Sequence, residues 1–172
     1  MDFKTFLNHV LTDTKVKLTD AFDRNFERKG FFNQKWTETK IPNRRGSLMI
    51  RTGTLRRSIR STIEGTTIRW TSAVPYAQVH NNGGEIEVTA KMKRYFWAMY
   101  YKVSGASKGS KGTKGKALSV EAEYYKALAL KKVGDKLSIP KRQFIGDHPE
   151  VKRMIDEIVS YNLNEVFKNI KP

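Results

Sequence analysis

The chain contains no cysteine and no long hydrophobic run, and each absence excludes a class of protein. Without cysteine it forms no disulfide, no thiolate metal site and no cysteine nucleophile, which fits a reducing compartment. No stretch approaches the roughly 18 to 20 apolar residues of a membrane helix. The N-terminal residues, with an acid at Asp2, lack the apolar core of an export signal. We therefore expect a soluble, unexported protein.

Acidic residues are scarce relative to basic ones. The 172 residues include 33 Lys or Arg and 17 Asp or Glu, which gives a formal net charge of +16. Residues 91–136 hold 12 of the basic residues and 3 of the acids, so this segment carries much of the excess. A basic field of this size favours a polyanionic neighbour, or it keeps a mobile loop soluble. Charge alone leaves both interpretations open.

No pattern typical of an enzyme is present. The three histidines, His9, His80 and His148, stand in separate settings without the short spacing of metal ligands. Two asparagines follow His80, as in a His-Asn nuclease, but no second metal ligand or catalytic carboxylate accompanies it. The glycines at 105–115 alternate with lysines and lack the GK[ST] sequence of a phosphate-binding loop. We predict no catalytic residue, no cofactor and no metal.

The chain has the length and the 38% hydrophobic content of one compact domain, residues 1–172. Apolar residues recur every three or four positions over residues 3–26, which predicts a long amphipathic helix that ends at Gly30. We expect its apolar stripe to pack in the core rather than against a partner. A second amphipathic helix is predicted at the C-terminus, with Asp147 as N-cap and Pro149 in its first turn.

Short strands are predicted between these helices. Four segments show the strand pattern: residues 60–64, 66–72, 85–90 and 136–139. The first two flank Gly65, which predicts a hairpin, and Pro140 ends the last strand. The elements together predict an α+β fold in which long N- and C-terminal helices pack a small antiparallel sheet.

Residues 30–47 break the helical periodicity and are interpreted as a surface loop. Its aromatics, Phe31, Phe32 and Trp36, either anchor on a neighbouring subunit or pack beneath the first helix. We favour packing within the chain.

Residues 91–133 predict an inserted basic helical hairpin. Its Gly/Ser/Lys tip, residues 104–116, cannot bury apolar surface and is expected to be flexible. Aromatics among the lysines of residues 91–103 either stack on nucleic-acid bases or pack at helix or subunit contacts, and we favour packing. Four lysines of the tip are candidates for contact with DNA or a partner protein: Lys108, Lys111, Lys114 and Lys116.

Three short blocks carry most of the functional signal. They are RTGTLRRSI at 51–59, PYAQVHNNGG at 75–84 and IPKRQFIG at 139–146. In the first block, Leu55 and Ile59 lie four residues apart on one helix face and should point inward, which leaves Arg56 outward.

The polar residues and glycines of the blocks have expected structural roles. Gly53 allows a positive φ, and Ser58 bonds locally. His80 is expected to form a hydrogen bond beneath the turn at Gly83 and Gly84. In the third block, Phe144 should lie in the core, Gly146 should turn the chain into the last helix, and Arg142 should hold a neighbouring loop or subunit.

In order and composition the blocks resemble the T/S-G-x-L-R-x-S-I, Y-A-x-x-H-x-x-G-G and I-P-x-R-x-F-x-G blocks of the phage virion morphogenesis family. The resemblance covers about residues 1–90 and 134–170. The matching positions are Gly53, Leu55, Arg56, Ser58, Ile59, Tyr76, Ala77, His80, Gly83, Gly84, Ile139, Pro140, Arg142, Phe144 and Gly146. Gln143 stands where the family commonly has proline, and the 91–133 insertion is longer than the pattern requires.

The resemblance implies a structural phage protein of the neck, active in tail completion or head-tail joining. It would assemble in the host bacterial cytoplasm as a closed ring at the head-proximal end of the tail. The implied partners are further copies of the chain, the tail-tube or tail terminator protein, the head connector proteins and genomic DNA in the channel. The net charge keeps a second hypothesis open, a stand-alone nucleic-acid-binding protein.

Overall fold

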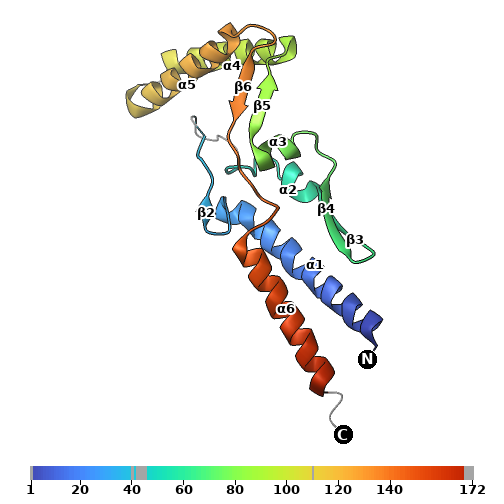
Figure 1. The fold of residues 1–172 in the computed structure, drawn as a ribbon. Helices are drawn as coiled ribbons and strands as arrows, with labels where there is room; N and C mark the ends of the chain where they lie inside the picture. Colours follow the sequence, from blue (N-terminus) through green and yellow to red (C-terminus); the bar gives the residue numbers. More distant parts are fainter. Residues whose placement is uncertain (1, 40, 42–45, 110, 169–172) are drawn as a thin grey trace. The chain divides into compact units, whose positions relative to one another are not determined.

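The computed structural model describes residues 2–39, 41, 46–109 and 111–168. Within these residues the chain forms six helices and three two-stranded antiparallel sheets, so the predicted α+β class is confirmed (Figure 1). The elements in chain order are α1 Phe3–Arg28, β1 Gly30–Phe31, β2 Gln34–Lys35, α2 Thr54–Ser58, β3 Ile59–Glu64, β4 Thr67–Ser72, α3 Ala77–Asn82, β5 Gly84–Glu87, α4 Ala90–Lys108, α5 Gly112–Leu130, β6 Lys136–Ile139 and α6 Pro149–Lys168.

The elements fall into two compact units. The first unit comprises Met1–Gly83 and Pro140–Pro172, and the second comprises Gly84–Ile139. The predicted insertion at 91–133 lies inside the second unit, which also contains the β5–β6 pair. Whether the whole chain acts as one domain stays a prediction.

In the first unit, α1 and α6 lie side by side and antiparallel (Figure 1). Leu18 and Phe22 of α1 are buried, and Val151, Met154 and Ile155 of α6 pack on the cluster that they form with Phe31. Burial of such side chains stabilises the folded chain by roughly 1.5–3 kcal/mol each. The predicted use of the α1 apolar stripe in the core is confirmed.

The ends of α1 follow from local hydrogen bonding. The carboxylate of Asp2 accepts a hydrogen bond from the Thr5 backbone N–H at 2.7 Å, which caps the first turn. At the other end, Lys29 adopts the left-handed conformation, with φ 55°. Gly30 is the first residue beyond the Lys29 cap, as predicted, but the left-handed conformation falls on Lys29 and not on the glycine. Gly30 also starts β1, opposite Lys35, where a side chain would lie 2.6 Å from the Gln34 carbonyl oxygen, so the pairing requires glycine.

The start of α6 also differs from expectation. Pro149 occupies the first helical position, as predicted. The predicted cap, Asp147, gives way to His148, whose Nδ1 accepts a hydrogen bond from the Glu150 backbone N–H at 3.2 Å. The ring of Phe32 stacks on His148 with centroids 4.7 Å apart, and this contact orients the imidazole for capping.

The aromatic residues after α1 form the centre of the first unit. Part of the predicted surface loop is the short β1–β2 hairpin, and residues 40 and 42–45 lie outside the described part. Trp36 packs edge-on against Phe26, with ring centroids 5.7 Å apart, in a buried cluster completed by Leu55 and Phe144. The preferred interpretation, packing within the chain, is confirmed for Phe31 and Trp36.

The β3–β4 hairpin is confirmed, with Ile59 opposite Ser72 and Gly65 in the turn. Trp70 turns its indole onto α1, where Nε1 donates a hydrogen bond to Thr19 Oγ1 at 3.0 Å. The strands do not form the one small sheet that was predicted. They form three separate pairs, because β5 pairs with β6 over Gly84 to Ile139 and not with the hairpin.

The second unit contains the β5–β6 ribbon and the helical hairpin of α4 and α5, so the predicted hairpin is confirmed. Helix extends into the Gly/Ser/Lys tract at both sides, over residues 104–108 and 112–116. Here the Ser107 and Ser119 hydroxyls lie 2.8 Å apart, and Gly115 is buried. Small residues let the two helices approach closely, which explains helix where an irregular tip was expected. Flexibility of the tract stays a prediction.

Candidate functional site

The first block forms α2 and places its apolar residues in the core. Gly53 precedes the helix with φ 72°, a conformation that favours glycine. Leu55 is buried and Ile59 packs on the same cluster, as predicted. Ser58 bonds locally, since its hydroxyl donates to the Leu55 carbonyl oxygen at 2.7 Å. The block therefore joins the hairpin to the core.

Arg56 does not face outward, which corrects the prediction. Its guanidinium turns back to α1 and donates to Asp23 at 2.6 Å through Nε and to Glu27 at 2.7 Å through Nη2. The hydrogen bonds that Arg56 donates to these carboxylates raise its pKa above the ordinary value. The helix periodicity of the block gave no signal for this ion pair, because the acids lie on another helix. Arg56 is therefore engaged within the chain.

The second and third blocks are joined directly. The Arg142 backbone N–H donates to the His80 carbonyl oxygen at 2.8 Å. The side-chain oxygen of Asn81 accepts from the backbone N–H groups of Phe144 at 2.9 Å and Ile145 at 3.1 Å. These bonds satisfy backbone N–H groups of a segment that lies outside the helices and strands and so lacks their regular hydrogen bonds. Asn81 was not among the predicted site residues, although it lies inside the second block.

Two residues outside the blocks, Trp36 and Asn25, hold the third block in place. The indole Nε1 of Trp36 donates to the Gln143 carbonyl oxygen at 2.6 Å. Asn25 is fully buried, and its amide donates to the Phe144 carbonyl oxygen at 3.2 Å. Sequence reasoning missed both roles. A polar residue next to Phe26 on the buried face of α1 was the available signal for Asn25.

The remaining block residues shape the chain at the ends of the third block. Gly83 has φ 74°, and a side chain there would lie 3.0 Å from the Lys141 backbone nitrogen. Gly84 pairs with Ile139 in the second unit, and β6 ends before Pro140, as predicted. Gly146 has φ 135° and lies between the core residue Phe144 and α6, which confirms its turn.

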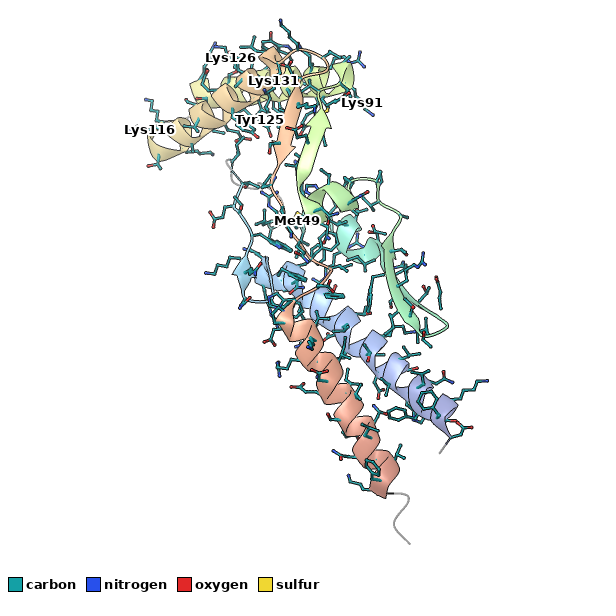
Figure 2. All side chains as sticks on the ribbon, in the orientation of Figure 1. Met49, Lys91, Lys116, Tyr125, Lys126 and Lys131 are labelled. Carbon is teal, nitrogen blue, oxygen red and sulfur yellow. The ribbon has the colours of Figure 1, made fainter. Side chains whose placement is uncertain are left out.

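Residues of the three blocks and of the segment before the first block line a partly open cavity of about 390 Å³ in the first unit. Its lining residues are Thr39, Ser47, Leu48, Met49, Arg51, Thr52, Gly53, Thr54, Leu55, Tyr76, His80 and Arg142. Met49 is labelled in Figure 2. The Tyr76 ring packs edge-on against His80 with centroids 5.8 Å apart. Ala77 packs on the neighbouring core cluster.

Arg142 and His80 set the electrostatics of the cavity. Arg142 is 7% exposed, and its Nε donates to the Thr37 carbonyl oxygen at 2.9 Å, so it holds a neighbouring loop as predicted. Burial lowers the pKa of Arg142. Burial, and then the positive charge of Arg142, lower the pKa of His80. The prediction of a His80 side-chain hydrogen bond is wrong at Nδ1. This atom is buried and has no hydrogen-bond partner in the described part of the chain.

Among residues that the structure describes, no three His, Cys, Asp or Glu side chains lie close enough to hold a metal ion. Within the same residues, no helix is both long and apolar enough to cross a bilayer.

Comparison with known families identifies the chain. The model of the phage virion morphogenesis family matches residues 28–164. The chain belongs to this family. The match includes all three blocks, the cavity residues and the helical hairpin, and it begins at the last residue of α1. The family is one of virion structure and assembly. No curated protein and no solved structure matches the chain significantly.

The candidate lysines of this family member lie at the tip of the α4–α5 hairpin. Lys108 ends α4, Lys111 caps α5, and Lys114 and Lys116 lie in the first turns of α5; all four are exposed. Figure 2 shows Lys116 at this end of the hairpin, with Lys91, Lys126 and Lys131 elsewhere on the second unit. The N-terminus of α5 carries no acidic residue, so the helix dipole adds to the positive field.

Proposed function

We propose that the chain is a structural protein of the phage neck, where it completes the tail or joins head to tail. In this proposal it assembles as a closed ring at the head-proximal end of the tail and becomes part of the virion. The family match over residues 28–164 carries the proposal. Its function is assembly and not turnover.

The packing of the three blocks supports this role. Backbone groups of the third block bond to Asn25, Trp36 and Asn81 from three other parts of the first unit. Such bonds hold an irregular segment in one conformation, and a preformed surface loses less entropy when copies associate. Phe31 and Trp36 are buried inside the unit, so these two side chains are not candidate subunit contacts.

A closed ring needs two different complementary patches on each copy. Exposed apolar side chains on α1 and α6 supply one candidate patch, with Phe3 at 76%, Tyr161 at 63% and Phe167 at 61% exposure. Large apolar groups left in water are typical of protein contacts when they cluster. The exposed face of the helical hairpin supplies a second candidate, with Tyr101 at 66% exposure.

The proposed partners are the tail-tube or tail terminator protein and the head connector proteins. If the lysine tip of the hairpin faces the channel, it contacts phosphates of the genomic DNA. If it faces outward, it contacts an acidic partner protein. In either position its positive charge accelerates association with an anionic surface.

Light scattering and negative-stain imaging test the proposal. The protein is measured alone and after mixing with the tail-tube protein encoded beside it. Closed rings or capped tube ends are expected. A persistent monomer that ignores the tube overturns the proposal.

The second candidate is a stand-alone nucleic-acid-binding protein, favoured by the net charge of +16 and the exposed tip lysines. It predicts tight binding to duplex DNA that falls by orders of magnitude between low and moderate salt. A monomer with this behaviour and no affinity for neck proteins supports the second candidate. Rings that bind free DNA weakly contradict it.

A further inference from the structure

The cavity between the three blocks contains a buried cation without a counter-charge. Arg142 is 7% exposed, and only its Nε donates a hydrogen bond, to the Thr37 carbonyl oxygen. In the described part of the chain, its terminal nitrogens Nη1 and Nη2 have no acceptor. A guanidinium has five N–H donors in a planar fork, so most of the donors of Arg142 remain available to a ligand in the cavity.

The rest of the cavity wall adds one more positive charge and several neutral polar groups. Nδ1 of His80 is buried without a partner among the described residues, and Arg51 adds a second guanidinium. No Asp or Glu occurs among the described residues that line the cavity. The hydroxyls of Thr52 and Thr54, which lie 2.9 Å apart, add neutral polar groups. The cavity is therefore arranged for an anion.

Arg142 has lost most of its hydration without gaining an opposite charge among the described residues, while its terminal nitrogens still reach solvent. Removing a charged group from water costs several kcal/mol unless an opposite charge and hydrogen bonds replace the lost hydration. Arg56 shows the usual solution in this protein, since two carboxylates of α1 pair with it. Arg142 is more buried than Arg56 and lacks such a partner among the described residues. A ligand that brings its own negative charge would satisfy it.

We propose that this cavity receives an Asp or Glu side chain from a neighbouring protein chain of the assembly. The inference rests on the proposed assembly role. A carboxylate matches the planar fork of a guanidinium and can accept two parallel hydrogen bonds from it. The apolar walls formed by Leu48, Met49 and Leu55 suit the methylene stem of such a side chain.

The shape of the site favours a protein carboxylate over DNA. Phosphates of duplex DNA lie along a rigid backbone and pair with exposed cations. Arg142 is 7% exposed at the wall of a recessed, partly open pocket of about 390 Å³, and a side chain that projects from a partner fits such a recess better than a rigid duplex does. The exposed lysines of the second unit are the better DNA contacts of this chain.

The first test measures binding of a free carboxylate by the whole chain. Sodium acetate is titrated at constant ionic strength against sodium chloride while the side-chain NMR signals of Arg142 and His80 are followed. Saturable shifts at millimolar acetate are expected in the wild type and in Arg60→Gln, an exposed arginine outside the cavity. They should be lost in Arg142→Gln. Absence of saturable shifts in the wild type overturns the inference, and equal titration by inorganic phosphate contradicts its selectivity for carboxylates.

The second test keeps Arg142 and supplies a carboxylate from the cavity wall of the same chain, so that a partner's carboxylate has to compete with it. Thr39 lines the cavity two residues beyond Thr37, so Thr39→Glu places a carboxylate near the guanidinium. Thr66→Glu, an exposed change in the β3–β4 turn, is the matched control. Thr39→Glu should weaken ring formation or tail-tube binding at least tenfold and leave the thermal midpoint unchanged or higher. The control should assemble like the wild type.

The outcomes distinguish failure of the carboxylate contact from failure of the proposed neck role. If Thr39→Glu and a folded Arg142→Gln both assemble like the wild type, the carboxylate contact is overturned while the neck role stands. If the wild type neither forms rings nor binds neck proteins, the proposed function fails, and the assembly contact of this inference fails with it. The acetate titration needs no assembly and still decides whether the cavity binds carboxylates.

Discussion

The Arg142 backbone N–H donates a 2.8 Å hydrogen bond to the carbonyl oxygen of His80, which joins the second and third sequence blocks at one point. The two side chains line the same cavity, and the positive charge of Arg142 lowers the pKa of His80. The backbone hydrogen bond therefore holds the Arg142 charge close to the His80 imidazole. Four predictions test this arrangement and the surfaces around it.

Removing the Asn81 side chain should destabilise the first unit. Asn81→Ala leaves the backbone N–H groups of Phe144 and Ile145 without their acceptor, at a cost of about 2 kcal/mol in the free energy of unfolding. Chemical denaturation measures it. Gln78→Ala, on the same helix, is the control, because Gln78 is exposed and should change stability by less than about 0.5 kcal/mol. Equal losses in the two variants would contradict the role given to Asn81.

The ion pair of Arg56 should contribute a modest, salt-sensitive stability. Its two carboxylate partners are partly exposed, so Arg56→Gln should lower the free energy of unfolding by about 0.5–1 kcal/mol at low salt. The loss should shrink in 1 M NaCl, which screens charges beyond about 3 Å. Arg24→Gln removes an exposed pair within α1 and should cost less. A loss that does not depend on salt would point to packing of the Arg56 side chain instead.

Protonation of His80 should destabilise the folded chain in mild acid. Burial and Arg142 lower the folded pKa of His80 below the ordinary value of 6.5, so the unfolded chain binds the proton first. This contribution to stability is fully present above pH 6.5 and is lost as the pH falls from 6.5 through the folded pKa. The free energy of unfolding should therefore fall less between pH 7.5 and 5 in His80→Gln than in the wild type. His9→Gln, at an exposed position, should retain the wild-type slope.

The lysine tip should account for much of the salt dependence of any DNA binding. Replacing Lys108, Lys111, Lys114 and Lys116 with Ser should lower the slope of log affinity against log salt by about 3 to 4, if each contacts one phosphate. A variant with four exposed lysines of the first unit changed to Ser is the control: Lys4, Lys17, Lys35 and Lys152. Unchanged DNA binding and assembly in the tip variant would remove the tip from both roles.

Local patterns predicted the elements well where one segment determines its own structure. The apolar period of α1, the β-branched runs around Gly65 and the block before Pro140 each gave the correct element. Helix ends were less accurate. The left-handed conformation at the end of α1 fell on Lys29 and not on Gly30. His148 took the place expected for Asp147, and its ring stacks on Phe32 of the neighbouring hairpin.

The sequence by itself determined the family, the α+β class, the excess of positive charge and the inward positions of Leu55, Ile59 and Phe144. These properties depend on residue type and short-range periodicity. Only the tertiary structure decided that Arg56 pairs with α1, that Asn81 holds the third block and that Arg142 lies in a cavity whose described wall has no acidic residue. Each of these relationships joins residues far apart in the chain, and their distances follow from packing rather than from spacing in the sequence.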